Sequence, residues 1–203
     1  MSVVSIVYHS GRGHTEVIAD AIGRGSRAVS GTEVHLISVD DVSDDTWALL
    51  NRSDAIIFGA PTYMGSASAP MKAFMDKTSR FFARTSWRDK LAAGFTNSAS
   101  QSGDKLNTLT QLAIFAAQHS MLWVSLGLPP GNNSSAGSPE DLNRLGSFLG
   151  AMAQSNADEP AAVAPPPTDQ RTAEMLGKRV AELACMWAPA LRAFNDQGMS
   201  ANA

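Results

Sequence analysis

The fold of this chain is decided by the stretch VVSIVYHSGRGHT, residues 3–15. Its first six residues are mostly apolar and β-branched, which is typical of a buried β-strand. A cluster of serine, glycine and histidine ends the strand, and apolar residues at helical spacing follow over residues 14–29. Because a strand that turns directly into a helix begins a βαβ unit, this stretch predicts an α/β fold with a parallel sheet.

Apolar runs of strand length alternate with amphipathic helical patterns five times, which favours a parallel sheet covered by helices on both faces. The predicted strands are residues 3–8, 33–39, 54–59, 91–96 and 121–126. The predicted helices are residues 14–29, 44–51, 69–80, 104–119 and 169–191. We therefore expect a single domain over residues 1–203, built on a five-stranded parallel sheet.

The last third of the chain is less regular. Residues 127–168 are expected to form an irregular insertion and a proline-rich connector, because glycine, proline, asparagine and serine are concentrated there. Within that segment, residues 142–152 either continue the fifth strand or form a short helix. Residues 197–203 are expected to form a frayed tail.

Composition and charge exclude several classes of function. The 203 residues carry a net charge of −3 without a basic stripe or tail, which disfavours nucleic acid and anionic membranes as partners. No apolar run approaches the ~20 residues that span a bilayer, and the N-terminal residues do not resemble a signal sequence. The single cysteine cannot form an internal disulfide, and no set of side chains has metal-ligand spacing. We expect a cytoplasmic protein with no membrane insertion and no metal site.

The first loop, residues 10–15, follows the first strand and reads SGRGHT. In an open parallel sheet, ligands bind at this end of the strands. The glycines let backbone N–H groups approach an anion, and the dipole of the following helix adds to the attraction. The loop matches neither the Walker A motif nor G-x-G-x-x-G. It favours a phosphate site, and an ordinary N-capped turn is the alternative.

Two further polar loops follow predicted strands. The second loop, residues 59–65, reads GAPTYMG, and the third loop, residues 97–103, reads NSASQSG. Tyr63 and Met64 are flat or soft side chains that suit the face of a planar ring, and the small residues of the third loop leave backbone N–H groups free for its edge. Each loop alone is also consistent with a plain turn. Together at one edge of the sheet, the three loops predict a mononucleotide site.

The strings VSIVYHSGRGHT, DAIIFGAPTYMGSASAPMKAFMDKT and KLAAGFTNSASQSG resemble the flavodoxin-like NAD(P)H:quinone oxidoreductases, the family that includes the tryptophan-repressor-binding proteins. The resemblance covers residues 3–124. It implies a three-layer sandwich with strand order 2-1-3-4-5 and FMN at the point where the order reverses. The phosphate would then lie on Ser10, Gly11, Arg12, Gly13, His14 and Thr15. The ring would lie on Pro61, Thr62, Tyr63, Met64 and Gly65 and on Asn97, Ser98, Ala99, Ser100, Gln101, Ser102 and Gly103.

The resemblance also implies roles outside these loops. Phe82 aligns with an aromatic residue that covers the ring in relatives, and Gln118 aligns with a ring-contacting histidine. Arg12 stands where relatives carry an aromatic residue near the nicotinamide nucleotide, and we expect it to attract a nucleotide phosphate. Phe82 is expected to form the apolar wall of a site for a planar substrate, together with Tyr63 and Met64. The alternative is that Phe82 makes a core or dimer contact. The family further implies a homo-oligomer, either a dimer or a tetramer.

The function that the resemblance implies is an FMN-dependent NAD(P)H:quinone oxidoreductase. NADH or NADPH would give a hydride to the flavin N5, and a quinone or flavin acceptor would then take both electrons in a ping-pong cycle. No side chain is expected to be catalytic, because backbone N–H groups of the third loop suffice to stabilise the negative charge of the reduced ring. One alternative is a flavodoxin-type electron carrier, which the low net charge disfavours. The other is an NAD(P)H-dependent FMN reductase, whose sequence pattern overlaps.

Overall fold

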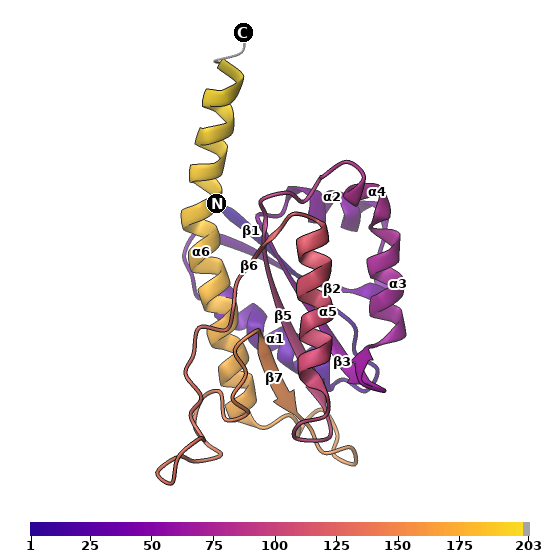
Figure 1. Ribbon diagram of the computed structural model, residues 1–203, viewed down its shortest axis with the longest axis vertical. Helices are drawn as coiled ribbons and strands as arrows, with labels where there is room; N and C mark the ends of the chain where they lie inside the picture. The colour runs from indigo at the N-terminus through magenta and orange to yellow at the C-terminus, as the bar shows by residue number, and fades with distance from the viewer. Residues whose placement is uncertain (201–203) are drawn as a thin grey trace.

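The computed structural model describes the backbone of residues 1–200 and the side chains of residues 1–193 (Figure 1). One sheet forms its centre, with the main strands in the order β2-β1-β3-β5-β6 and all parallel. These strands are β2 (Thr32–Ser38), β1 (Ser2–Tyr8), β3 (Ala55–Tyr63), β5 (Leu91–Ser98) and β6 (Leu122–Trp123). The predicted order 2-1-3-4-5 is confirmed, because β5 is the fourth predicted strand and β6 lies in the fifth.

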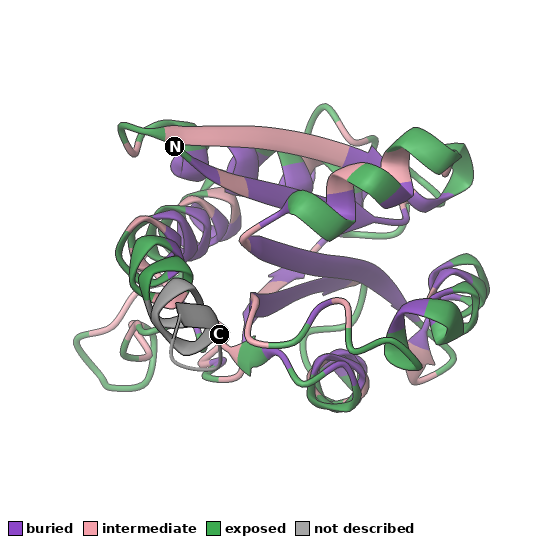
Figure 2. Ribbon diagram, turned by 90° about the horizontal axis from the view of Figure 1, so that it is seen from above, coloured by how far each residue is buried: buried purple, intermediate pink, exposed green. Residues whose placement is uncertain are grey.

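Helices cover both faces of the sheet, so the predicted three-layer sandwich is confirmed (Figure 2). One face carries α1 (His14–Arg27) and α6 (Pro167–Ser200). The other carries α2 (Asp44–Arg52), α3 (Ala69–Lys77), α4 (Ser79–Phe82) and α5 (Lys105–Gln118), and a 3₁₀ turn, η1, spans Val39–Asp41. Successive residues of a strand serve opposite cores, since Ile6 packs on the α1/α6 side and Val7 on the other.

The fifth strand is split, which corrects the prediction of one strand over residues 121–126. β6 has two residues, and β7 (Ala151–Gln154) takes over the same edge of β5 after a long excursion. The chain returns at Gly150, where a Cβ would lie 2.2 Å from the carbonyl oxygen of Gly94, so only glycine fits this approach. Residues 142–152 are therefore not a helix, and the last two of them belong to β7.

The third strand is longer than predicted. β3 runs on to Tyr63 instead of ending at residue 59, because Ala60 and Pro61 stay paired with β5. A short strand, β4 (Ser66–Ala67), then turns back antiparallel on the end of β3. The second loop is thus mostly strand and hairpin, which holds its residues in fixed positions.

Two helices also differ from the prediction. The helix expected over residues 69–80 is divided into α3 and α4 at Thr78, whose hydroxyl donates to the carbonyl of Met75. α6 begins at Pro167 and continues past residue 191. The frayed tail predicted over 197–203 falls on residues whose side chains or backbone lie outside the described part. Within residues 1–200, no helix is long and apolar enough to cross a membrane.

Candidate functional site

The three polar loops meet at the carboxyl ends of β1, β3 and β5, at one end of the sheet (lower end in Figure 1). They surround a cavity of about 740 Å³. Its walls are Gly11, Arg12, His14, Thr15, Pro61, Thr62, Tyr63, Met64, Gly65, Asn97, Ser98, Ala99, Ser100, Gly103, Asp104, Ser155 and Ala157. A volume of this size lies within the usual range for cofactor and ligand sites.

The first loop presents unpaired backbone donors at the start of α1. Gly13 caps the helix with φ +84° and no side-chain hydrogen bond, while Ser10 Oγ accepts from the N–H of Glu16 at 3.1 Å. Among the described residues, no acceptor serves the N–H groups of residues 11–15. Unpaired N–H groups at a helix N-terminus form an anion site, strengthened by the helix dipole.

The connector after β7 covers the first loop, a role that sequence reasoning missed. His14 is buried and its Nε2–H donates to the carbonyl of Glu159 (2.8 Å), so its side chain is already used within the chain. Arg12 Nη1 donates to the carbonyl of Ala157 (3.2 Å). Ser155 and Ala157 line the cavity. The available signal was topological, because residues that follow a parallel strand must emerge at the same end of the sheet.

The second loop forms a tight hairpin at the mouth of the cavity. Met64 and Gly65 have φ of +49° and +79°, the pattern of a type I′ turn between β3 and β4. Asn107 of α5 fixes the turn by donating to the carbonyl of Gly65 (2.6 Å). The turn leaves Met64 fully exposed and Tyr63 44% exposed, so both side chains are accessible at the opening of the cavity.

Thr62 lines the cavity and also stabilises the structure around it. Its hydroxyl is buried and shares hydrogen bonds of 2.8 Å with the hydroxyls of Thr96 and Thr108. Three elements, β3, β5 and α5, are joined by this triad. The Thr62 side chain is therefore occupied, which leaves its backbone for contact with a ligand.

The third loop is held by hydrogen bonds from Gln154 and Ser155, which follow it in the fold. Gln154 Nε2 donates to the carbonyl of Ala99 (2.9 Å), and Ser155 donates from its N–H to the carbonyl of Ser98 (3.1 Å). The Ser155 hydroxyl also donates to Asn97 Oδ1 (2.9 Å). Among the described residues, no acceptor serves the N–H groups of residues 99–103. Of these residues, Ala99, Ser100 and Gly103 line the cavity, so the loop offers it a second set of free donors besides those of the first loop.

Two buried groups near the site have shifted pKa values. Burial, with the nearby Glu16 carboxylate, raises the pKa of Tyr8 to about 12, and the Tyr8 hydroxyl donates to Glu16 at 3.1 Å. Burial lowers the pKa of Lys105 to about 8. Lys105 directly follows the third loop and Asp104, so a positive charge lies behind that wall of the cavity.

Not every predicted site residue reaches this cavity. Phe82 and Gln118 line a separate hollow of about 230 Å³ beside His119, so one chain does not bring them to the three loops. The physical reason is that α4 and the end of α5 lie toward the opposite end of the sheet from the loops (Figure 1). Ser10, Gly13, Gln101 and Ser102 belong to the loops but do not line the cavity itself.

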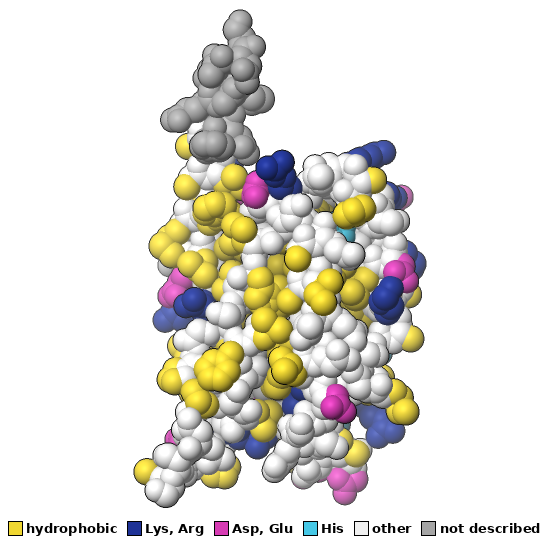
Figure 3. All heavy atoms as spheres, in the orientation of Figure 1, with side chains coloured by type: hydrophobic (Ala, Val, Ile, Leu, Met, Phe, Trp, Pro, Cys, Tyr) yellow, Lys and Arg dark blue, Asp and Glu magenta, His cyan; other side chains and the backbone are white. Residues whose placement is uncertain are grey.

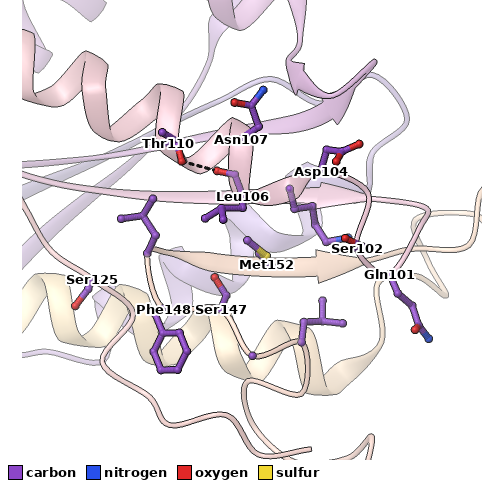
Figure 4. A pocket seen from close by; sticks show the side chains of 14 residues that line it. Gln101, Ser102, Asp104, Leu106, Asn107, Thr110, Ser125, Ser147, Phe148 and Met152 are labelled. Atoms are coloured by element: carbon purple, nitrogen blue, oxygen red, sulfur yellow. Dashed lines mark hydrogen bonds between the residues drawn. The ribbon is translucent and has the colours of Figure 1, made fainter. Parts of the chain in front are cut away.

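A larger hollow of about 980 Å³ lies on the other side of the third loop, between α5 and the segment around β7 (Figure 4). Gln101 and Ser102 line it, together with apolar side chains such as Leu106, Phe148 and Met152. Apolar side chains also gather on this face of the molecule between α5 and α6 (Figure 3). The hollow includes no residue of the first or second loop, so the predicted chemistry belongs to the smaller cavity.

Comparison with known proteins bears on the identity of this site. An NAD(P)H dehydrogenase (quinone) from Archaeoglobus fulgidus is 31% identical over 206 residues, which cover 91% of this chain and 98% of the relative. The crystal structure of the flavodoxin, WrbA-like protein from Agrobacterium tumefaciens superposes with a TM-score of 0.73 at 39% identity, over 92% of this chain and 99% of that one. The chain belongs to the flavodoxin-like NAD(P)H:quinone oxidoreductase family. The predicted family membership is confirmed.

Two other similarities refine this placement. Flavodoxin FldP from Pseudomonas aeruginosa is 43% identical over 183 residues, 90% of this chain and 97% of the relative. The sequence pattern of the family described as NADPH-dependent FMN reductase matches residues 38–128. The family therefore includes relatives named as oxidoreductases and a relative named as a flavodoxin.

Proposed function

We propose that this protein is an FMN-dependent NAD(P)H:quinone oxidoreductase that works by a ping-pong cycle. The observation that carries the proposal is the cavity of about 740 Å³, which is lined by two loops with unpaired backbone donors, the first and the third. One set belongs to a helix N-terminus and suits a phosphate, and the other suits the polar edge of a ring. The chemical character of both walls fits FMN.

Different loops would bind different parts of FMN. The N–H groups of the first loop and the Thr15 hydroxyl would bind the phosphate, and Ser10 shapes that loop through its bond to Glu16. A Cβ at Gly11 would lie 2.6 Å from the hydroxyl of Tyr63, so a larger residue there would displace the Tyr63 side chain at the mouth of the cavity. The N–H groups of Ala99, Ser100 and Gly103, which line the cavity, would face the ring edge and stabilise negative charge there.

The protein supplies position and charge, while the flavin supplies the redox chemistry by accepting a hydride from NADH or NADPH and passing two electrons to an acceptor. Among the described residues of the cavity wall, Asp104 is the one carboxylate, which fits a site that accumulates negative charge during reduction. Tyr63 and Met64 border the open face where the nicotinamide and then the quinone would stack in turn. Arg12, exposed and held by one bond to the carbonyl of Ala157, keeps donors free for a nucleotide phosphate.

Phe82 and Gln118 fit this function only through a second copy of the chain. Both line a hollow that is separate from the cavity, and Phe82 is 54% exposed. In a homo-oligomer, the hollow of one subunit would cover the open cavity of another and bring these two side chains to the substrate. Sedimentation of the FMN-loaded protein tests this, since a monomer would leave both residues without a role.

The proposal is tested by an anaerobic titration of the FMN-loaded protein. The flavin absorbance is expected to bleach with NADH or NADPH and to return when benzoquinone is added. Substituting Gly11 by alanine should weaken FMN binding, whereas the same change at Gly31, with no atom within 4 Å of its Cβ position, should not. A wild-type protein that binds no FMN, or a bound flavin that pyridine nucleotides do not reduce, would refute the proposal.

A second candidate is a flavodoxin-type electron carrier, favoured by the 43% identity to Flavodoxin FldP. The same titration separates the two functions. A carrier would be reduced by dithionite in one-electron steps and respond slowly to NADH and NADPH. An FMN reductase, which the match over residues 38–128 suggests, would instead release FMN readily on gel filtration.

A further inference from the structure

Lys105 is a fully buried lysine placed directly behind the third loop. Its side chain is 0% exposed, and its Nζ donates to Ser98 Oγ (2.8 Å) and to the carbonyl of Ser100 (2.6 Å). Both acceptors belong to the third loop and both line the cavity. Lys105 itself lies on the other side of that loop, where it borders the larger hollow. A cation in this position acts on the cavity only through the loop.

The charges around Lys105 leave it uncompensated. Asp169 of α6 is buried and already forms a two-fold ion pair with Arg144, whose Nε and Nη2 lie 2.7 and 2.9 Å from the two carboxylate oxygens. Asp169 attracts the Lys105 ammonium and Arg144 repels it. The neighbouring residue in the chain, Asp104, carries a carboxylate that is exposed to solvent. Lys105, Arg144 and Asp169 together therefore carry one net positive charge, with Lys105 and Asp169 buried and the Arg144 side chain 12% exposed.

Burying an uncompensated ammonium group lowers the stability of the folded protein. A buried ammonium loses its hydration, and here only two hydrogen bonds to the loop replace it. A charge fixed in a region of low dielectric is, however, an effective way to stabilise negative charge that develops nearby. Two electrons and one proton leave the reduced ring with a negative charge, and the third loop is the wall proposed to face its polar edge.

We propose that Lys105 is a positioning residue that fixes the third loop and favours the reduced form of the flavin in the cavity. The inference rests on the proposed function. It assigns to one side chain two effects that can be separated by experiment. The hydrogen bonds hold the loop whether or not FMN is present, and the charge acts only when FMN is bound.

The charge is tested by the ratio of the dissociation constants for oxidised and reduced FMN. Lys105→Met removes the charge and the hydrogen bonds, and Lys105→Gln removes the charge but keeps a donor. Both are expected to lower the ratio about tenfold, which corresponds to a reduction potential about 30 mV more negative for two electrons. Lys90→Met is the matched control, because burial lowers the pKa of both lysines to about 8 but Lys90 donates to the carbonyls of Asn51 and Ser53, at the other end of the sheet.

The pH dependence gives a readout that a purely structural lysine would not affect. Because the pKa of Lys105 is lowered to about 8, with Asp169 raising it and Arg144 lowering it, the wild-type ratio should fall toward that of Lys105→Met as the pH rises past about 8. The Lys105→Met protein should lack this change. An unchanged ratio in both Lys105 variants, at every pH, overturns the charge effect.

The positioning effect is tested without FMN. The backbone N–H groups of residues 155 and 105 donate to the carbonyls of Ser98 and Ser102 in the third loop. Their amide hydrogen exchange should be at least several-fold faster in apo Lys105→Met than in wild type, and intermediate in Lys105→Gln. Equal exchange in all three proteins overturns this half of the inference. If the wild-type protein binds no FMN, the proposed function and the charge effect fail together, while hydrogen exchange still decides whether Lys105 positions the loop.

Discussion

Replacing Gly103 by alanine is expected to disable the third loop. Gly103 has φ +54°, a left-handed conformation that costs an L-residue about 1–2 kcal/mol. The new Cβ would also lie 2.2 Å from Oγ of Ser98, so that hydroxyl has to move. Its movement breaks the hydrogen bond from Lys105, and a bond to a charged group contributes about 1.5–3 kcal/mol. We expect the free energy of unfolding to fall by about 2.5–5 kcal/mol in total.

The matched control is Gly31→Ala, at a turn remote from the cavity. Gly31 has φ +82° but no atom within 4 Å of the Cβ position, so the control has only the left-handed cost of about 1–2 kcal/mol. Urea unfolding of the apo proteins measures both losses, and quenching of FMN fluorescence measures binding. Gly31→Ala should bind FMN as the wild type does, and Gly103→Ala should bind it at least tenfold more weakly. Equal unfolding losses together with equal FMN affinities would show that the reasoning is wrong.

Three further predictions concern buried charges. Asp169→Ala leaves the largely buried Arg144 side chain, 12% exposed, without its partner and should lower the free energy of unfolding in urea by about 3–5 kcal/mol, whereas a loss below about 1 kcal/mol would contradict the assigned pair. Burial lowers the pKa of Lys90 to about 8, so the unfolded chain binds more protons between pH 8 and 10 and stability should rise with pH there. In Lys90→Met the free energy of unfolding should rise less between pH 8 and 10. An equal rise with pH in wild type and Lys90→Met, measured by urea unfolding, would refute this assignment. Burial also lowers the pKa of His119, so the free energy of unfolding should decrease as the pH falls below about 6.5. His119→Phe should therefore show a smaller drop in Tm from pH 7 to pH 5, and an equal drop would count against the assignment.

The alternation of strand and helix was predictable because each central strand is buried on both faces. Residues such as Ile56 and Ile57 serve opposite cores, so the strand is apolar throughout and stands out from its polar loops. The end of β3 was not predictable in this way. Pro61 signals a break in most strands, yet here it pairs with β5 at the last position before the hairpin, where the hydrogen bonds of the ladder are ending.

The first and third loops were predictable from composition, but their partners were not. Glycine and serine after a buried strand indicate free backbone donors, whatever the chain does elsewhere. The contacts of Ser155 and Ala157 depend on where the chain returns to the sheet, and nothing local in those residues reports it. The same holds for Phe82 and Gln118, since an aligned position indicates a role in a relative without showing which copy of the chain supplies it.

The split fifth strand connects the fold to the site. β6 and β7 divide one edge of β5, and only the β7 half reaches the loop end of the sheet. This half brings Gln154 to the carbonyl of Ala99, while the Asp169 carboxylate that accepts the N–H of Gln154 also holds Arg144 of the insertion. The insertion thus supplies the backing of the third loop and the arginine of the ion pair beside Lys105, while α6 supplies the carboxylate. A continuous fifth strand would pair β5 equally well but would place no insertion residue there. We therefore attribute the position of the third loop to two sources, the hydrogen bonds from Lys105 and the place where the chain returns to the sheet with Gln154 and Ser155.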